Sequence, residues 1–398
     1  MLRFARALAV AALVSSTILG CGDSGTTTGG PPDTSVKLVF DLAADLHDAA
    51  HFYDAPYPSD LRLDADGHPD LAGFPNPSSV ATVTGLATEA EANPGFPVIP
   101  VAFLRLDGAL APRVPTDVIA AEPSAPIMLL DVDPASPEKG RLYPVIAQTL
   151  TPDAYTAENV LAVATRPGFI LRASTKYAVV VLATANDADG KALGKNDLVE
   201  RMASGGSPAT GEEAAFALYA PLWDALEVAG VDATQVVAAT VFTTGDVVAA
   251  TAKLGDAVVD AYDVTLEGLA LDAADIYPEL CLLRGKVTLP QFQKGTPPYD
   301  TDGLFEIGAD GQPKMQRMEE APFAVVIPRT PMPADGYPLV LNVHGSGGFS
   351  VAMVQPVNDA GVPGDPIGPA FPYATKGIGM AGVAMPVNPE RLPGAEET

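Results

Sequence analysis

The most informative stretch in the C-terminal part of this chain is Gly336-Tyr-Pro-Leu-Val-Leu-Asn-Val-His-Gly-Ser-Gly-Gly348. Residues 338–343 are almost continuously apolar, which is typical of a strand with both faces covered. The run passes directly into His344 and a glycine-rich turn. Glycines let the backbone turn sharply and leave N–H groups free to point at an anionic oxygen. The stretch therefore predicts a buried strand with an oxyanion-binding loop at its carboxyl end.

Further apolar runs lie on either side of this strand. Residues 284–292 and 322–328 precede it, and residues 378–385 follow it, each with the composition of a strand. Residues 370–376 fit a short helix. Together these runs predict a sheet in the C-terminal region, residues 266–398.

The preceding region, residues 36–265, is predicted to be β-rich with a helical tail. Pro, Asp and Gly turns separate its strands at a spacing that suggests an Ig-like sandwich. Helical periodicity appears in 211–228, where Trp223 is expected in the core, and again in 246–262. The strands are expected at residues 98–106, 126–131, 141–148, 177–183 and 235–243. The expected fold class is therefore mixed α+β and α/β.

The N-terminus reads as a secretory signal over residues 1–20, with Arg3 and Arg6 before an apolar run. The run ends in Ile18-Leu-Gly-Cys21, which resembles the lipobox of bacterial lipoproteins. The resemblance implies that Cys21 is lipidated and that 21–35 is a flexible tether. It implies a location in the bacterial cell envelope, anchored to the outer membrane or the cell surface. The alternative is an ordinary cleaved signal with an incidental cysteine.

Composition excludes several classes of protein. The 398 residues carry a formal net charge of −26, and 47% of them are hydrophobic. The chain is too apolar to be globally disordered, and it has no Lys/Arg cluster of the kind that binds nucleic acid. Its 37 glycines and 39 prolines favour β-rich structure with many turns. The only cysteine besides Cys21 is Cys281, which is expected to be a buried small apolar residue rather than a nucleophile.

The C-terminal motifs resemble those of α/β-hydrolases. The stretches 323–329, 336–348 and 376–385 carry this resemblance, and the apolar runs match strands one to four of that fold. Three upstream segments resemble bacterial virulence-factor-lipase-type lipoproteins. These segments are 52–63, the strand and turn at 177–190, and Val236-Val-Ala-Ala-Thr-Val-Phe-Thr-Thr244. In these lipoproteins an Ig-like domain precedes an α/β-hydrolase domain. The resemblance implies carboxylic ester hydrolysis, with an ester or lipid substrate and no cofactor.

The catalytic part of that resemblance is incomplete. The chain contains no Gly-x-Ser-x-Gly, and His344 is its last histidine. Ser346 superficially mimics a nucleophile, but a serine without a base is a poor nucleophile at neutral pH. Only the oxyanion-loop positions carry over, and no serine-esterase triad activity is expected. These positions are Gly345, Ser346, Gly347 and Gly348.

The sequence is therefore interpreted as an incomplete copy: a gene fragment, a frameshifted frame or a degenerate homologue. Strand 339–343 would then be an exposed sheet edge, which invites a protein partner. The competing hypothesis is a non-catalytic surface lipoprotein. It would bind a partner or a glycan through its Ig-like domain.

Two other patterns suggest metal sites only weakly. His47 and His51 are spaced to share one helix face, but no third ligand is indicated and packing is favoured. Acidic turns recur at 64–67, 187–190 and 300–303, where Asp-Gly is more typical of a β-turn than of a calcium loop. No metal site is predicted.

Overall fold

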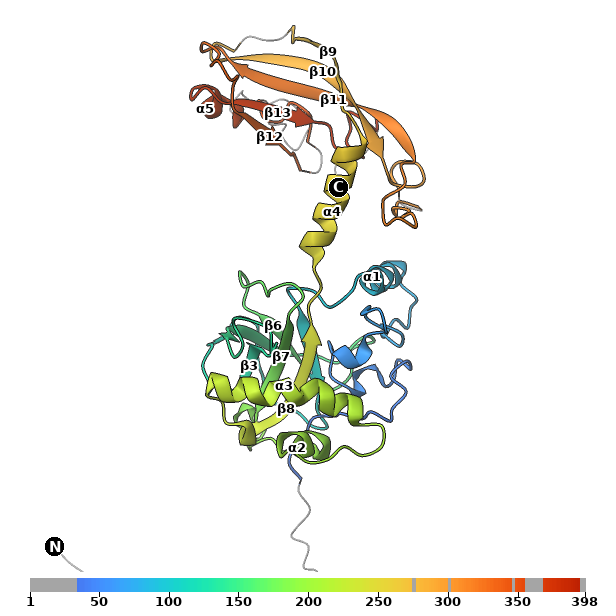
Figure 1. The fold of residues 1–398 in the computed structure, drawn as a ribbon, viewed down its shortest axis with the longest axis vertical. Helices are drawn as coiled ribbons and strands as arrows, with labels where there is room; N and C mark the ends of the chain where they lie inside the picture. Colours follow the sequence, from blue (N-terminus) through green and yellow to red (C-terminus); the bar gives the residue numbers. More distant parts are fainter. Residues whose placement is uncertain (1–33, 274–276, 300–301, 346–347, 355–367, 394–398) are drawn as a thin grey trace, which may run out of the picture. The chain divides into compact units, whose positions relative to one another are not determined.

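The computed structural model describes residues 34–273, 277–299, 302–345, 348–354 and 368–393. The chain divides into two compact units between Gly245 and Asp246 (Figure 1). The sequence placed this division later, at 265/266. The helix α4 (Val247–Ala261) is consequently grouped with the second unit. The expected mixed α+β class is confirmed, because most strand pairs are antiparallel and few helices accompany them.

The first unit contains two four-stranded sheets in which every strand pair is antiparallel. One sheet has the order β1 (Val101–Arg105), β6 (Val160–Thr165), β5 (Val145–Thr149) and β2 (Val118–Ile119). The other has the order β4 (Leu142–Tyr143), β3 (Ile127–Asp131), β7 (Lys176–Leu182) and β8 (Val236–Thr243). All the strands that the sequence predicted in this region are present. The apolar residues of these strands form the hydrophobic core of the first unit.

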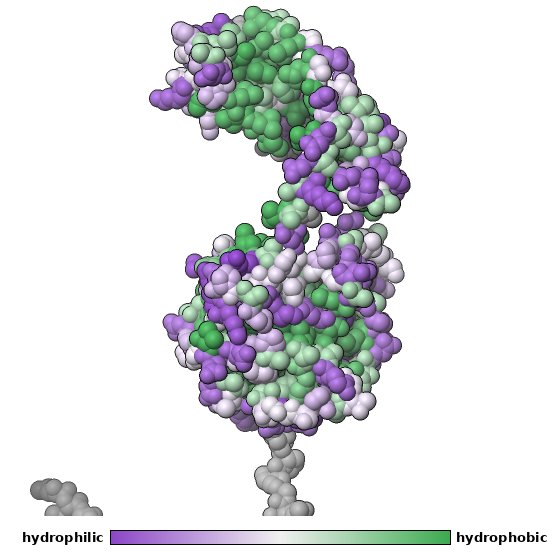
Figure 2. Space-filling view, in the orientation of Figure 1, coloured by the Kyte–Doolittle hydropathy of each residue, from purple (hydrophilic) through white to green (hydrophobic). Residues whose placement is uncertain are grey.

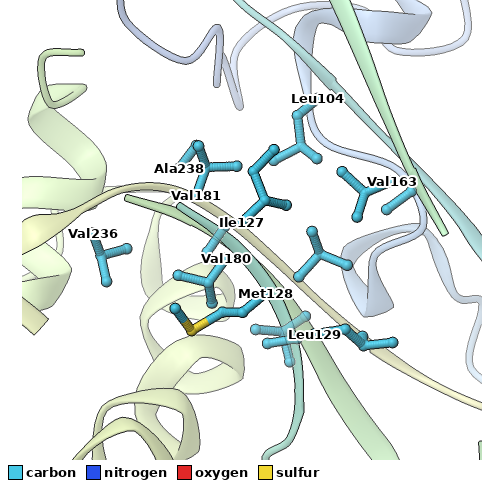
Figure 3. Close-up of a cluster of buried hydrophobic side chains, with 14 of the residues drawn as sticks. Leu104, Ile127, Met128, Leu129, Val163, Val180, Val181, Val236 and Ala238 are labelled. Atoms are coloured by element: carbon cyan, nitrogen blue, oxygen red, sulfur yellow. The ribbon is translucent and has the colours of Figure 1, made fainter. Parts of the chain in front are cut away.

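Helices cover one face of the second sheet. The helices α2 (Asp197–Ala203) and α3 (Glu213–Ala229) follow β7, and the hydroxyl of Tyr219 on α3 donates to the carbonyl of Ala239 on β8 at 2.9 Å. The sheet therefore has covered faces on both sides, which explains why every residue of β3 is buried. Figure 3 shows Ile127 and Val181 of this sheet in one cluster with Leu104 of the other. Trp223 is half-buried and packs against that core rather than lying within it.

The remaining elements of the first unit are short. The helix α1 (Ala81–Glu91) buries none of its residues. The described part of this unit also contains four 3-10 helices: η1 (Phe52–Asp54), η2 (Asp60–Arg62), η3 (Ala183–Ala185) and η4 (Ala233–Gln235).

The second unit is built on one five-stranded sheet with the order β12 (Leu339–Asn342), β13 (Gly379–Val383), β11 (Arg317–Pro328), β10 (Leu280–Gln291) and β9 (Leu266–Leu271). The strands β12 and β13 are parallel, and the other neighbours are antiparallel. The short helix α5 (Ala370–Ala374) lies between β12 and β13 in the chain. The four predicted strands and this helix are therefore confirmed. The strand β9 was not predicted, because all six of its residues are exposed and no burial pattern marks it.

The two faces of this sheet differ. One face packs Leu282, Val326 and Met380 against Met353 and Ala374. The register places a row of apolar residues on the other face, one from each strand: Leu341, Ala381, Val325, Leu283 and Leu271. Figure 2 shows apolar side chains gathered over this sheet.

The sequence predicted that the run 338–343 is buried on both faces, and this prediction is wrong. Leu339, Leu341 and Val343 are 61%, 62% and 63% exposed, whereas Val340 packs against the buried cluster. The reason is the place of β12 in the sheet: among the described strands it lies at the edge. The edge position itself agrees with the sequence-based expectation.

Candidate functional site

The parallel strands β12 and β13 end at the same border of the sheet, and the candidate site lies there. In a parallel pair, the loops after the carboxyl ends are where ligands usually bind. Nε2 of His344, after β12, lies 3.3 Å from the backbone nitrogen of Met385, after β13. Nδ1 of the same ring lies 2.8 Å from the carbonyl oxygen of Gly345. Because Met385 supplies an N–H, Nε2 is the accepting nitrogen and Nδ1 carries the proton.

The imidazole is therefore held by backbone groups on both of its nitrogens. A general base needs a free nitrogen within reach of the proton that it removes. His344 has none in this arrangement. Its role is to fix the two loops against each other.

The glycines of the loop have different surroundings. A Cβ on Gly348 would lie 2.7 Å from Nδ1 of His344, so only glycine lets the loop close over the ring. A Cβ on Gly345 would meet nothing within 4 Å. The N–H of Gly348 donates to the carbonyl of Gly345 at 3.2 Å, so the expectation of free N–H groups in this turn is wrong at Gly348. Ser346 and Gly347 lie outside the described residues.

The segment after β13 holds this loop in place. The side-chain amide of Asn388 donates to the carbonyl of Gly348. The carboxylate of Glu390 accepts from the backbone N–H of Ser350 at 2.5 Å and from its hydroxyl at 3.0 Å. A Cβ on Gly382 would lie 2.5 Å from the carbonyl oxygen of Ser350, so the loop lies directly on β13.

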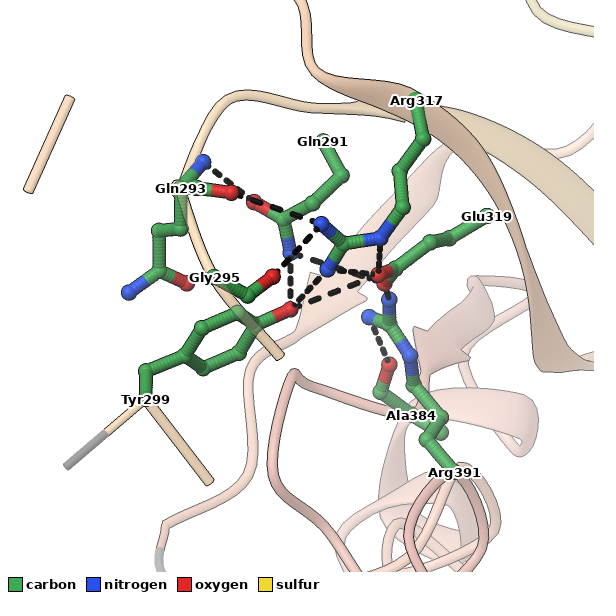
Figure 4. A network of polar contacts seen from close by, with 8 residues as sticks. All are labelled: Gln291, Gln293, Gly295, Tyr299, Arg317, Glu319, Ala384 and Arg391. Atoms are coloured by element: carbon green, nitrogen blue, oxygen red, sulfur yellow. Dashed lines mark hydrogen bonds and ion pairs between the residues drawn. The ribbon is translucent and has the colours of Figure 1, made fainter. Parts of the chain in front are cut away.

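Arg391 connects the same segment to β11. Its guanidinium pairs with the carboxylate of Glu319 and donates to the carbonyl of Ala384 at 3.3 Å. Figure 4 shows that Arg317 and Tyr299 approach Glu319 from the other side. Burial alone would raise the pKa of Glu319, but the hydrogen bond and charge of Arg317 and the charge of Arg391 outweigh it and lower the pKa.

The arrangement offers anion binding rather than nucleophilic chemistry among the described residues. The backbone N–H of Gly348 is used within the turn, whereas that of Gly345 takes no part in the hydrogen bonds of the turn. The described serine beside it, Ser350, is 2% exposed and bonded to Glu390, so its hydroxyl is not presented to a substrate. An oxyanion stabilised by backbone amides is the chemistry that this loop supports.

Comparison with known proteins finds no protein-family model, curated protein or solved structure that matches this chain. The geometry of the chain itself therefore carries the functional argument.

The two histidines near the N-terminus do not share a helix face. Nε2 of His47 lies 2.9 Å from a carboxylate oxygen of Asp70, and Nδ1 of His51 lies 2.6 Å from one of Asp54. The hydrogen bond to Asp54 raises the pKa of His51 against a smaller effect of desolvation. No group of three or more potential ligands from His, Cys, Asp or Glu occurs in the part of the chain that the structure describes.

Two of the acidic turns are β-turns, as expected. Asp64 accepts from the backbone N–H groups of Asp66 and His68, and Asp187 accepts from those of Asp189 and Lys191. Their glycines have φ angles of +85° at position 67 and +80° at position 190. The third turn includes residues 300 and 301, which lie outside the described residues.

The two cysteines are placed differently. Cys281 is half-buried rather than buried, because it alternates along β10 with Leu280 and Leu282 and lies on the face of the sheet opposite to the buried cluster. Cys21 falls outside the described residues. None of the described helices is long and apolar enough to cross a bilayer.

Sequence reasoning missed the residues that tie the site together. Asn388, Glu390 and Arg391 follow β13 in a polar, proline-containing turn, Pro386-Val-Asn-Pro-Glu-Arg391. A polar turn directly after a buried strand was the available signal. It does not by itself indicate which loop the turn would contact.

Proposed function

We propose that this chain is a lipid-anchored relative of bacterial lipases and esterases, with an Ig-like first unit and an α/β-hydrolase-type sheet in the second. The loop at 344–348 would form the oxyanion-binding part of an ester-hydrolysing site. The single observation that carries the proposal is the sheet order. An α/β-hydrolase sheet places its first four strands in the order one, two, four, three, with the second antiparallel, and β10, β11, β13 and β12 lie in this order.

The position of the loop supports the same proposal. The His-Gly motif follows the strand that corresponds to the third of that fold, where such enzymes carry an oxyanion loop. His344 and Asn388 hold the loop against the end of β13. An oxyanion donor must be preorganised in this way, because a loop that has to reorganise loses most of its electrostatic advantage.

Binding of an anion to the Gly345 amide tests this proposal directly. A short alkyl phosphonate resembles the tetrahedral oxyanion and needs no nucleophile. Titrated into the ¹⁵N-labelled chain, it should shift the amide resonance of Gly345 saturably and leave that of Gly348 nearly unchanged, since the Gly348 N–H is already bonded. Equal shifts at both glycines, or none at Gly345, would contradict the proposal.

Hydrolysis itself is not expected from this sequence, which lacks Gly-x-Ser-x-Gly. The purified chain should not cleave a p-nitrophenyl ester above the rate in buffer. Hydrolysis that disappears in Ser346→Ala would show instead that Ser346 is a nucleophile.

A non-catalytic role has one specific observation in its favour. The edge strand β12 and the residue after it expose three apolar side chains, and the segment 338–343 contains no charged residue to discourage pairing. A strand of a partner protein could add to this edge. Binding of the partner without any anion binding at Gly345 would favour this second candidate.

A further inference from the structure

The first unit contains a small apolar pocket beneath the helix α1. Its walls are Val83, Leu86 and Ala87 of the helix and Tyr57, Leu71 and Phe74 below it, and its volume is about 270 Å³. The helix residues are spaced i, i+3 and i+4, so they lie on one face. The pocket opens to solvent, since Leu86 in its wall is 67% exposed. Covering apolar surface that is in contact with water is favourable, so a pocket with these walls favours an apolar occupant.

Polar contacts hold α1 at its two ends rather than along its middle. At the N-terminal end, Asn76 accepts from the N–H of Val80 at 2.9 Å and donates to the hydroxyl of Thr84 at 3.2 Å. At the C-terminal end, the carboxylate of Glu91 accepts from the N–H of Leu71 at 3.0 Å, and the carbonyl of Glu91 lies 2.8 Å from Nδ1 of His68. The middle of the helix spans the pocket and buries no residue.

The floor of the pocket is a set of packed aromatic rings. Phe52 is 1% exposed, and its ring centroid lies 5.3 Å from that of Phe74 and 5.6 Å from that of Tyr57. Tyr57 also packs edge-on against Phe96 at 5.7 Å. Rings packed in this way leave the floor little freedom to collapse into the space above it.

The chemistry of the walls restricts the occupant. No charged side chain lines the pocket, and the phenol of Tyr57 is the single polar side-chain group in its wall. Burial raises the pKa of Tyr57 to about 12, so the phenol is neutral at physiological pH. An ordered water typically needs two to four polar partners, and this wall offers a single polar side-chain group. The pocket therefore favours an apolar occupant over water.

We propose that this pocket binds a single uncharged aliphatic chain. An apolar cavity of roughly 150 Å³ is enough to take up benzene, so the space under α1 accommodates a larger hydrocarbon. The net charge of −26 disfavours a fatty-acid anion, and the wall offers no cation to compensate it. The chain of an alcohol or an ester is apolar enough for these walls and carries no charge.

Methyl NMR of the full chain carrying Cys21→Ser provides the test, since this substitution prevents lipidation and leaves no acyl chain to compete. Titration with 1-octanol should shift the methyl signals of Leu71, Val83, Leu86 and Ala87 saturably. Octanoate should bind at least about tenfold more weakly, because its carboxylate finds no partner. No saturable shift, shifts elsewhere only, or octanoate binding as tightly as octanol would overturn the proposal.

A matched pair of variants on the same helix locates the site. Ala87→Phe fills the pocket and should weaken octanol binding about tenfold or more, because the added ring takes the apolar surface that the chain would bury. Ala81→Phe adds the same ring at an exposed position on the opposite side of the helix and should change binding less than about twofold. Equal loss in both variants, or no loss in Ala87→Phe, would overturn the assignment. The wild-type titration decides the proposal even if Ala87→Phe does not fold.

Discussion

The imidazole of His344 accepts a hydrogen bond from the backbone N–H of Met385, and this contact joins the ends of two parallel strands that lie about forty residues apart in the chain. The contact positions the glycine loop over the carboxyl end of β13. His344 is thereby assigned a positioning role in the site.

Removing the ring should release the loop. In His344→Ala, Met385 loses its acceptor, and a typical hydrogen bond contributes about 0.5–1.5 kcal/mol. The amide hydrogen of Met385 should therefore exchange with solvent up to about tenfold faster. His344→Gln, whose side-chain oxygen can also accept, should lose less. Unchanged exchange in His344→Ala would show that the ring does not hold Met385.

The two described glycines of the loop should respond differently to alanine. A Cβ on Gly348 would press on the His344 ring at 2.7 Å, so Gly348→Ala should destabilise the loop by about 1–3 kcal/mol. Gly345→Ala places its Cβ in open space and should be nearly neutral. Limited proteolysis within 344–350 measures the difference. Equal protease sensitivity of the two variants would contradict the packing described at Gly348.

The ion pair between Glu319 and Arg391 predicts a pH dependence for the second unit. The pKa of Glu319 is lowered in the folded chain, so the carboxylate stabilises the fold above its unfolded pKa of about 4.3. This contribution is lost as pH falls from about 4.3 through the lower folded pKa.

Glu319→Gln should remove that part of the acid dependence and cost about 1–3 kcal/mol near neutral pH, because the Arg391 side chain, 10% exposed, loses its carboxylate. Glu320→Gln, at an exposed neighbouring position, is the control. Unfolding is followed by hydrogen exchange in β11 between pH 3 and 7. An acid response that is the same in both variants would rule out the role given to Glu319.

The exposed edge of β12 predicts concentration-dependent association. Leu341 is 62% exposed on an uncharged strand, so Leu341→Lys should reduce association by placing a charge on the edge. The same change at Leu271, on the opposite edge, should have little effect, since β9 already carries Glu267. Light scattering over a range of concentrations compares the two variants. A larger effect at Leu271 would place the association at the other edge.

The main strands could be predicted because their apolar runs are continuous or strictly alternating. This holds for β10, β11, β12 and β13 in the second unit, and for β7 and β8 in the first. In contrast, β9 has no buried residue to mark it. Tyr219, fully buried against Ala239, was also missed, because helical spacing alone does not rank one apolar position above another.

The candidate site was predicted only in part. The position of the loop follows from a strand that runs into His344-Gly345. Its partners Asn388, Glu390 and Arg391 lie about forty or more residues away, and their contacts depend on β13 lying beside β12. Pairing between strands that are distant in the sequence cannot be read from local patterns.

The fold of the second unit depends on the parallel pairing of β12 and β13, and disulfide trapping examines this pairing. On a background with Cys21→Ser and Cys281→Ser, cysteines at positions 341 and 381 are opposite each other and should cross-link on mild oxidation. Cysteines at 339 and 383 should not, because parallel strands separate them by four residues, about 13 Å along the sheet. If the strands were antiparallel around the same centre, 339 and 383 would also be opposite each other. We expect cross-linking at 341/381 alone, and cross-linking at 339/383 would show that the strands are not parallel.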